Sequence, residues 1–185
     1  TKRQETKTGF TQQWAGAEEN GWITGFNGAT RNGAGLDKLL TYKDLALPAK
    51  FTVAADVKIE TADGAHFAGV AFNIQDAKNF YVFRVNSGSG NGICQVLKMV
   101  NGEWKDIKTM NFDAVKAGTA YTLSVQATAP GAFTVSIRKG EEVVLKPESL
   151  NDANAPAYQG GSAGIYMGAA ECSITGFSVE AAAAK

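Results

Sequence analysis

Several polar side chains of this sequence occupy alternate positions of short apolar segments, where they would share one face of a sheet. They carry amide, guanidinium or phenol groups, and they are Asn73, Gln75, Arg84, Asn86, Gln95 and Tyr166. Such groups bind hydroxyls, while an aromatic ring packs on the apolar face of a sugar ring. Trp104, just past a turn at 101–102, is the aromatic candidate at the rim of this face. The pattern predicts a sheet face that binds a saccharide.

Two of these residues have an alternative explanation. Trp104 would also pack across a hairpin on Met99. Arg84 would also form an ion pair with a neighbouring carboxylate on an exposed sheet. Neither alternative involves a ligand.

The sequence gives little support for a catalytic site. Glycosidases place two carboxyl groups about 5–10 Å apart across the scissile bond. The nearest acidic groupings, Asp56 with Glu60 and Glu141 with Glu142, put no two acids on adjacent positions of one strand face. One histidine and two scattered cysteines cannot assemble a zinc cluster. The sequence therefore favours binding over catalysis, although acids from different strands would still make a glycoside hydrolase.

Composition excludes several classes of protein. The chain has 185 residues with 18 Lys plus Arg and 18 Asp plus Glu, so its formal net charge is zero. This balance argues against nucleic-acid binding and against a polybasic membrane anchor. No apolar run approaches the roughly 20 residues of a membrane-spanning helix, so we expect no membrane insertion. A hydrophobic content of 44% is enough to bury a core.

The hydrophobic pattern is that of β-strands. Residues 51–59, 121–127 and 133–137 alternate between apolar and polar side chains, and Asn101-Gly102 predicts a two-residue hairpin turn. Further strands are expected at 22–26, 36–42, 67–75, 80–86, 143–145, 162–167 and 172–179, with a single helical turn around 147–153. Val70, Phe72 and Ile74 are assigned to the core face of their strand. Short strands with Gly or Asn turns predict an antiparallel sandwich or barrel.

One domain is expected over residues 10–179. Residues 1–9 are predicted to form a flexible lead-in, and residues 180–185 a helix-prone tail or tag. Cys94 and Cys172 leave two alternatives open, one disulfide or two free thiols.

The order of segments resembles the concanavalin A-like lectin and glucanase superfamily. The resemblance rests on Phe51-Thr-Val-Ala-Ala-Asp-Val-Lys-Ile, Ala68-Gly-Val-Ala-Phe, Asn79-Phe-Tyr-Val-Phe-Arg-Val, the hairpin around Asn101-Gly102, Gly118-Thr-Ala-Tyr and Gly164-Ile-Tyr. Laminin-G-like domains and the sandwich modules of bacterial glycoside hydrolases are the most similar groups. The resemblance implies an all-β, two-sheet antiparallel jelly-roll sandwich whose concave sheet binds an oligosaccharide or polysaccharide.

The resemblance also implies a cellular location and two alternative functions. We expect an extracytoplasmic bacterial domain, with other domains of a larger secreted protein as partners. The glucanase signature Glu-x-Asp-x-x-Glu is absent, and of the lyase residues only Arg84 and Tyr166 have counterparts. A glycoside hydrolase or polysaccharide lyase of the same fold is one alternative, and a cell-surface protein-interaction or structural domain is another. A structural Ca²⁺ is common in the superfamily, and its candidate ligands here are Asp63, Asn151, Asp152 and Asn154.

Overall fold

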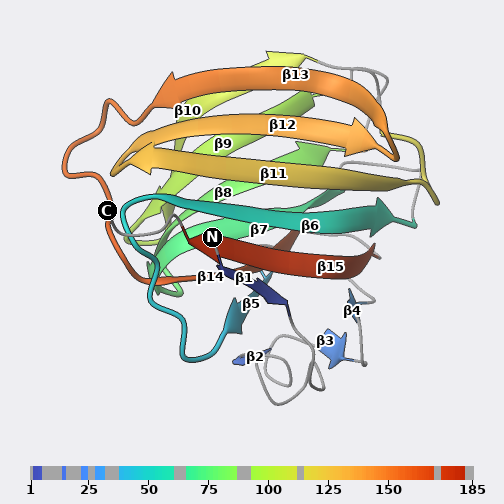
Figure 1. Cartoon of the computed structure of the whole chain (residues 1–185), viewed down its shortest axis with the longest axis horizontal. Coiled ribbons are helices and arrows are strands. Elements are labelled where there is room, and N and C mark those ends of the chain that lie inside the picture. The colour runs from blue at the N-terminus through green and yellow to red at the C-terminus, as the bar shows by residue number, and fades with distance from the viewer. Residues whose placement is uncertain are drawn as a thin grey trace.

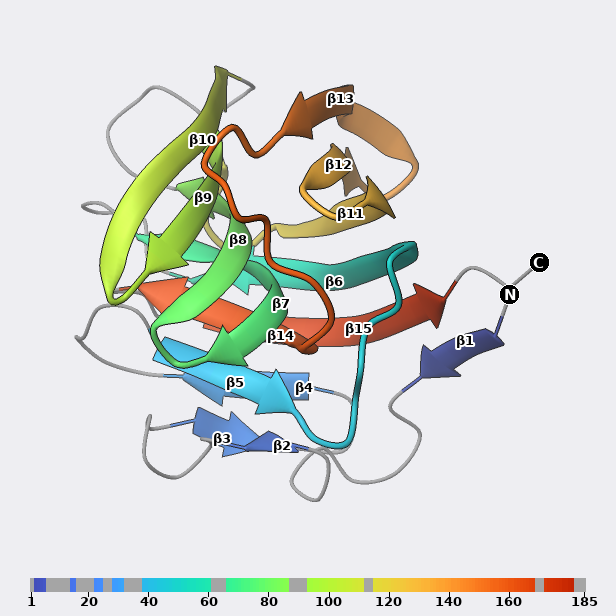
Figure 2. The ribbon, with the colours of Figure 1, turned by 90° about the vertical axis from the view of Figure 1, so that its left-hand side faces the viewer.

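The computed structural model describes residues 2–5, 14–15, 22–24, 28–31, 38–60, 66–86, 93–111, 115–168 and 172–181. Within these ranges every regular element is a β-strand. The strands form two antiparallel sheets that face one another (Figures 1 and 2). This all-β, two-sheet architecture confirms the predicted fold class.

We call the eight-stranded sheet sheet A and the seven-stranded sheet sheet B. Sheet A runs in the order β13 (Glu142–Asn151), β12 (Ala132–Lys139), β11 (Ala120–Ala129), β6 (Phe51–Ile59), β15 (Cys172–Ala181), β4 (Gly28–Arg31) and β3 (Trp22–Thr24), with β1 (Lys2–Glu5) paired to β15. Sheet B runs in the order β10 (Glu103–Asn111), β9 (Ile93–Val100), β8 (Asn79–Asn86), β7 (Phe67–Asp76), β14 (Ser162–Gly168), β5 (Lys38–Tyr42) and β2 (Trp14–Ala15).

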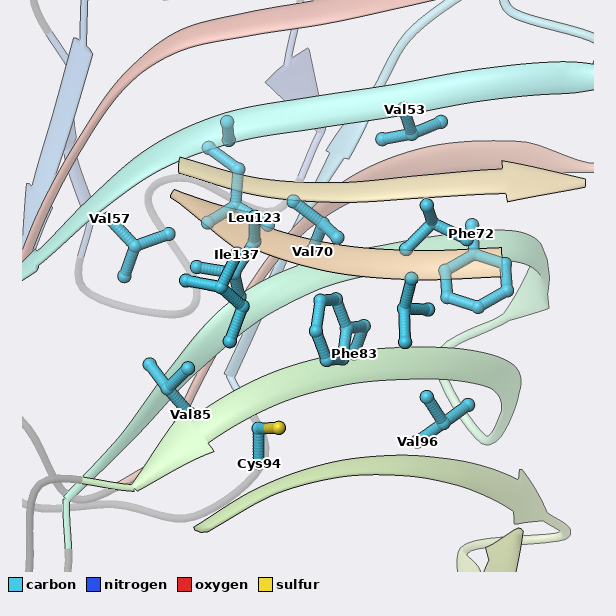
Figure 3. Packing of buried hydrophobic residues seen from close by; sticks show 14 of the residues in the cluster. Val53, Val57, Val70, Phe72, Phe83, Val85, Cys94, Val96, Leu123 and Ile137 are labelled. Atoms are coloured by element: carbon cyan, nitrogen blue, oxygen red, sulfur yellow. The ribbon is translucent and has the colours of Figure 1, made fainter. Parts of the chain in front are cut away.

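The main core lies between the two sheets. Val53, Leu123 and Ile137 of sheet A pack in one buried cluster with Phe72 and Phe83 of sheet B (Figure 3). In β6 the burial alternates strictly from Phe51 to Ile59, as the sequence pattern predicts for a strand with one face on a core. The predicted alternation is therefore what fixes the register of sheet A.

Cys94 is one of the residues in this core, and its sulfur points into the interior in Figure 3. It is a free thiol. Burial, followed by the charge of Glu148, raises its pKa to about 12. The structure thus favours the alternative without a disulfide for Cys94, while the side chain of Cys172 lies outside the described residues.

The hairpin predicted at Asn101-Gly102 is confirmed. It joins β9 to β10, with φ of 51° at Asn101 and 84° at Gly102. Positive φ at both central residues is what a type I′ turn requires. This turn fixes the pairing of Trp104 with Met99, and so places the tryptophan on one face of sheet B.

The helical turn predicted around 147–153 is wrong, because β13 continues through Asn151. Pro147 lies within β13, which is the last strand of sheet A in the described residues and pairs there with β12 alone, so its missing backbone N–H is tolerated. Strands also occur near both ends of the sequence. Strand β1 falls within the predicted lead-in, and β15 extends two residues into the predicted tail. Both segments join sheet A by pairing rather than by an apolar pattern, which is why the sequence did not indicate them.

A β-bulge at Asn73 changes the faces of β7. Asn73 has φ of 47°, and the pairing of β7 shifts register with both β8 and β14 at this point. An extra residue in one strand reverses which side chains face the core beyond it. The predicted core position of Ile74 is therefore wrong, because Ile74 packs in a cluster on the opposite face.

This second cluster lies on the face of sheet B that is turned away from sheet A, which we call the outer face. It contains Leu39, Ala71, Ile74, Phe80, Val82, Leu97, Met99 and Tyr166, with Phe67 and Trp104 packed against it. All of these residues belong to strands of sheet B, and they alternate with the residues of the main core. The outer face thus carries a second cluster of buried apolar and aromatic side chains, instead of an ordinary row of exposed polar ones.

Candidate functional site

One row of residues crosses the outer face from strand to strand. Register pairs Thr109 with Gln95, Gln95 with Arg84, Arg84 with Gly69, and Gly69 with Tyr166. Directly paired residues of antiparallel strands lie on the same face. Because Gly69 has no side chain, the side chains of Arg84 and Tyr166 can meet across β7.

Hydrogen bonds run along this row and hold Arg84 in place. Its Nε and Nη2 donate to Gln95 Oε1 at 3.2 and 3.0 Å, and its Nη1 donates to the Tyr166 hydroxyl at 3.0 Å. Gln95 Nε2 donates in turn to Thr109 Oγ1 at 3.3 Å, and that hydroxyl donates to Asp106 Oδ2 at 3.1 Å. The Asp106 carboxylate orients the Thr109 hydroxyl, and this hydroxyl orients the Gln95 amide. The amide oxygen then holds the guanidinium of Arg84.

Aromatic rings surround the same guanidinium. Its central carbon lies 4.0 Å from the ring centroid of Phe67, 5.4 Å from that of Trp104 and 5.7 Å from that of Tyr166. A cation near a ring face is attracted by the negative charge of the π-system. We call Phe67, Arg84, Gln95, Trp104 and Tyr166 the arginine–aromatic cluster.

Trp104 is anchored and yet only partly covered. It meets the rings of Phe80 and Tyr166 edge-on, with centroid distances of 5.7 Å in both cases. It is also the cross-strand partner of Met99, and both belong to the outer-face cluster, so the predicted packing is confirmed. The side chain remains half-buried, which leaves part of the ring accessible.

The ion-pair alternative for Arg84 is not found in the described part of the chain. The salt bridges there involve lysines, and none includes Arg84. A guanidinium has five N–H donors. Three hydrogen bonds to Gln95 and Tyr166 leave two donors, one on each terminal nitrogen, that no described residue accepts. Arg84 is therefore half-buried and positively charged, with donors available to a ligand.

Four of the predicted site residues meet in the cluster, namely Arg84, Gln95, Trp104 and Tyr166. Asn86 lies two positions along β8 from Arg84 on the same face, opposite Phe67. The structure does not bring Asn73 and Gln75 to the cluster. Both lie at the bulge and hold the loop before β14.

Their hydrogen bonds show this structural role. Asn73 is 4% exposed, and its Nδ2 donates to the carbonyl of Gly160 at 2.8 Å. Gln75 Nε2 donates to the carbonyls of Asn73 and Gln159 at 3.1 and 3.0 Å. These bonds give Asn73 and Gln75 a structural role at the bulge, where Asn73 has positive φ, and their predicted role in ligand binding stays a prediction.

Sequence reasoning missed Phe67, Thr109 and Asp106. Phe67 is the first residue of β7 and has the same parity as Gly69, which was the available signal. Thr109 and Asp106 share the outer face only because a register shift between Asp106 and Lys108 reverses the alternation of β10. No pattern in the sequence marks that shift.

A second buried cation lies on the inner side of sheet B. Lys98 of β9 has a side chain that is 3% exposed, and its Nζ lies 2.7 Å from Oδ2 of Asp152, whose side chain is 0% exposed. The same ammonium donates to the carbonyls of Asn154 and Pro156 at 2.6 and 2.9 Å. It also lies 4.7 Å from the ring centroid of Tyr158. All three hydrogens of this ammonium therefore have an oxygen acceptor.

The carboxylate of Asp152 is equally occupied. It accepts hydrogen bonds from the Tyr81 hydroxyl at 2.7 Å and from the backbone N–H of Asn154 at 2.8 Å. Burial by itself raises the pKa of Asp152, but the hydrogen bonds from Lys98, Tyr81 and Asn154 and the charge of Lys98 lower it below its ordinary value.

These contacts decide how well the loop fits a Ca²⁺ ion. Calcium needs six to eight oxygen ligands. Here Lys98 takes the Asp152 carboxylate and the Asn154 carbonyl, so these residues as arranged do not fit the ion. Asn151 is exposed at the end of β13, and Asp63 lies outside the described residues. Among the described His, Cys, Asp and Glu residues, no group of three or more is placed to hold a metal.

The sequence contains one match to the pattern of a catalytic serine nucleophile. Residues 160–164 read Gly-Gly-Ser-Ala-Gly, which matches Gly-x-Ser-x-Gly. Ser162 begins β14 of an antiparallel sheet, and its Oγ donates to the carbonyl of Tyr42 at 2.6 Å. A nucleophile elbow places its serine between a strand and a helix. Ser162 is therefore a structural residue.

Known structures share this architecture over almost the whole chain. Carbohydrate-binding module CBM66 from Bacillus subtilis aligns with a TM-score of 0.67 and 17% identity, covering 98% of this chain and 96% of that one. A protein described as functionally unknown from Saccharomyces cerevisiae aligns with a TM-score of 0.66 and 14% identity, covering 96% and 100%. The exoplasmic/lumenal domain of VIP36 in its Ca²⁺/Man-bound form aligns with a TM-score of 0.64 and 10% identity, covering 99% and 84%.

The fold is the concanavalin A-like jelly roll. No family model matches the chain, and no curated protein matches it by sequence. Carbohydrate-binding proteins are thus among the structural neighbours that share this jelly roll. In the described residues of the jelly roll no helix is long and apolar enough to cross a membrane.

Proposed function

We propose that this jelly roll is a non-catalytic carbohydrate-binding domain of an extracytoplasmic protein, and that it binds its saccharide on the outer face of sheet B. The observation that carries the proposal is the half-buried Arg84, whose neighbours hold it by three hydrogen bonds and which has two donors that no described residue accepts. A rigid donor loses little conformational freedom on binding, so more of each hydrogen bond contributes to affinity.

Each residue of the cluster has a distinct role in this proposal. Arg84 donates to oxygens of the saccharide, and the accessible part of the Trp104 ring packs on its apolar C–H face. Gln95 and Tyr166 position Arg84 through their hydrogen bonds. Asn86, on the same face of β8, supplies an amide for a neighbouring hydroxyl. Carbohydrate-binding structures among the neighbours support the saccharide partner, whereas the residue roles rest on the contacts of this chain alone.

A role in binding another protein has less support. Such a surface would present a contiguous apolar patch. Of the residues whose side chains the structure describes, Val143 is the only exposed large hydrophobic, at 45%, and it lies on β13 of sheet A. The described surface therefore does not favour a protein partner over a saccharide.

Affinity electrophoresis in gels that contain neutral and acidic polysaccharides tests the proposal, with reducing-sugar release followed over hours. We expect retardation by at least one polysaccharide and no release of product. Arg84→Gln should weaken the retardation at least about tenfold, since a charged hydrogen bond is lost. Arg138→Gln is the matched control, because Arg138 is an exposed arginine on β12 of sheet A. Equal retardation of both variants would contradict the site, and product release would indicate an enzyme.

A further inference from the structure

We infer that the saccharide bound at the arginine–aromatic cluster is acidic, with the carboxylate of a uronic acid residue paired to Arg84. This inference rests on the proposed function and specifies its ligand class. It is carried by the charges of the described residues around Arg84 and by the two donors of Arg84 that no described residue accepts.

Within the described part of the chain, Arg84 differs from the other cations of its neighbourhood in having no carboxylate partner. The lysines of β9 and β10 all have one: Lys98 pairs with Asp152 at 2.7 Å, Lys105 with Glu103 at 4.0 Å, and Lys108 with Glu148 at 3.1 Å. The groups that contact Arg84 are an amide, a phenol and three rings, all neutral. A half-buried positive charge among neutral groups is stabilised when an anion binds beside it.

One carboxylate belongs to the same series of hydrogen bonds, but two other residues of the series separate it from Arg84. Asp106 reaches Arg84 only through Thr109 and Gln95, and its side chain is exposed. Water screens an exposed carboxylate well, so Asp106 orients the chain without neutralising the guanidinium. Among the described residues none places a carboxylate against Arg84, and in this inference the ligand supplies that negative charge.

The free donors match a carboxylate in number. One N–H remains on each terminal nitrogen of the guanidinium, and paired donors on one planar group bind the two oxygens of a carboxylate together. The Phe67 ring lies 4.0 Å from the guanidinium carbon, so a ligand has to reach the donors from another side. A neutral sugar offers single hydroxyls there and leaves the charge uncompensated.

Matched polysaccharides test this inference. The full chain is titrated with polygalacturonate, alginate and hyaluronan, with the carboxyl-reduced neutral form of each, and with neutral inulin, xylan and mannan. We expect at least one acidic polymer to bind and its carboxyl-reduced form to bind at least about tenfold more weakly. Arg84→Lys, which keeps the charge without the paired donors, should bind this polymer with an affinity between those of wild type and Arg84→Gln. Arg138→Gln should bind it like wild type.

The outcomes separate the two proposals. Equal binding of an acidic polymer and its reduced form, or binding of neutral polymers alone, would overturn the acidic ligand while leaving carbohydrate binding intact. Binding of an acidic polymer that Arg84→Gln does not weaken would also overturn it, provided that thermal unfolding shows this variant to be folded. Failure to bind any of the polymers would overturn both the ligand class and the proposed function.

Discussion

Two cations of sheet B sit among aromatic rings, and their surroundings are opposite in character. Lys98 faces the interior, is 3% exposed on its side chain and contacts Asp152 and two carbonyls. Arg84 faces outward and is half-buried, and the described residues that contact it are all neutral. Both are held rigidly, but only Arg84 has donors that no described residue accepts.

The difference separates a structural charge from a binding charge. A buried ammonium whose hydrogens all find acceptors contributes to the folded state and has nothing left for a ligand. A positioned guanidinium with unused donors is held ready for an anion. Burial alone does not distinguish these roles, whereas a count of donors and acceptors does.

The largest expected effect comes from breaking the interior pair. Lys98→Met leaves the carboxylate of Asp152 buried without its counter-charge, and we expect it to lower the free energy of unfolding by about 3–5 kcal/mol. Urea unfolding of this variant and of Lys105→Met measures the effect, since Lys105 is exposed on β10. An equally small loss in both variants would show that Lys98 is not a structural charge.

A second prediction concerns the pH dependence of the same pair. The pKa of Asp152 is lowered in the folded protein, so its carboxylate stabilises the fold above its unfolded pKa of about 3.9. This stability is lost as the pH falls through the folded pKa. Asp152→Asn has no such carboxylate, so the difference in unfolding free energy between wild type and Asp152→Asn should shrink between pH 5 and pH 2. The change is at most about 1.4 kcal/mol per pH unit, and guanidinium unfolding at several pH values measures it. A constant difference would contradict the lowered pKa.

A third prediction makes the surroundings of Arg84 like those of Lys98. Gln95→Glu keeps an oxygen acceptor for the guanidinium but adds a negative charge, so Arg84 becomes a paired cation. We expect the affinity for an acidic polysaccharide to fall about tenfold, with a change in unfolding free energy of less than about 1 kcal/mol. Isothermal titration calorimetry compares it with Gln126→Glu, which adds the same charge at an exposed position of β11. Equal affinities in the two variants would show that the charge of Arg84 does not contribute to binding.

The smallest expected effect is at the far end of the hydrogen-bond chain. Thr109→Val removes both the donor to Asp106 and the acceptor for Gln95, although Thr109 is exposed. We expect a loss of about 0.5–1 kcal/mol in binding free energy, because water replaces part of these bonds. The same calorimetric titration measures it. A loss as large as that of Arg84→Gln would mean that Thr109 contacts the ligand itself.

Much of the fold follows from strands whose pattern is local. The alternation of β6 and β11 and the Asn101-Gly102 turn determine pairing and faces directly, and the outward position of Arg84, Gln95 and Tyr166 follows from parity. The alternation of faces is interrupted where an extra residue enters a strand, as at Asn73. No residue type in the sequence indicates where such a bulge occurs.

The interior pair could not be predicted from local pattern. Lys98 and Asp152 lie 54 positions apart by number, 152 − 98, and the loop of Asp152 was read as a calcium candidate from its oxygens alone. Their meeting depends on how the loop before β14 crosses the end of the sandwich. Tertiary packing of this kind leaves no periodic signal in the sequence.

The contrast between the two cations is tested most directly by an NMR titration that observes both. In ¹H–¹⁵N spectra of the labelled domain, addition of a bound acidic polysaccharide fragment should shift the Arg84 Nε–H and Trp104 indole N–H signals, with Trp104→Phe identifying the latter. The backbone signals of Lys98, Asp152 and Arg138 should stay in place. A ligand that binds without shifting Arg84 and Trp104, or that shifts the residues of sheet A instead, would contradict the outer-face site.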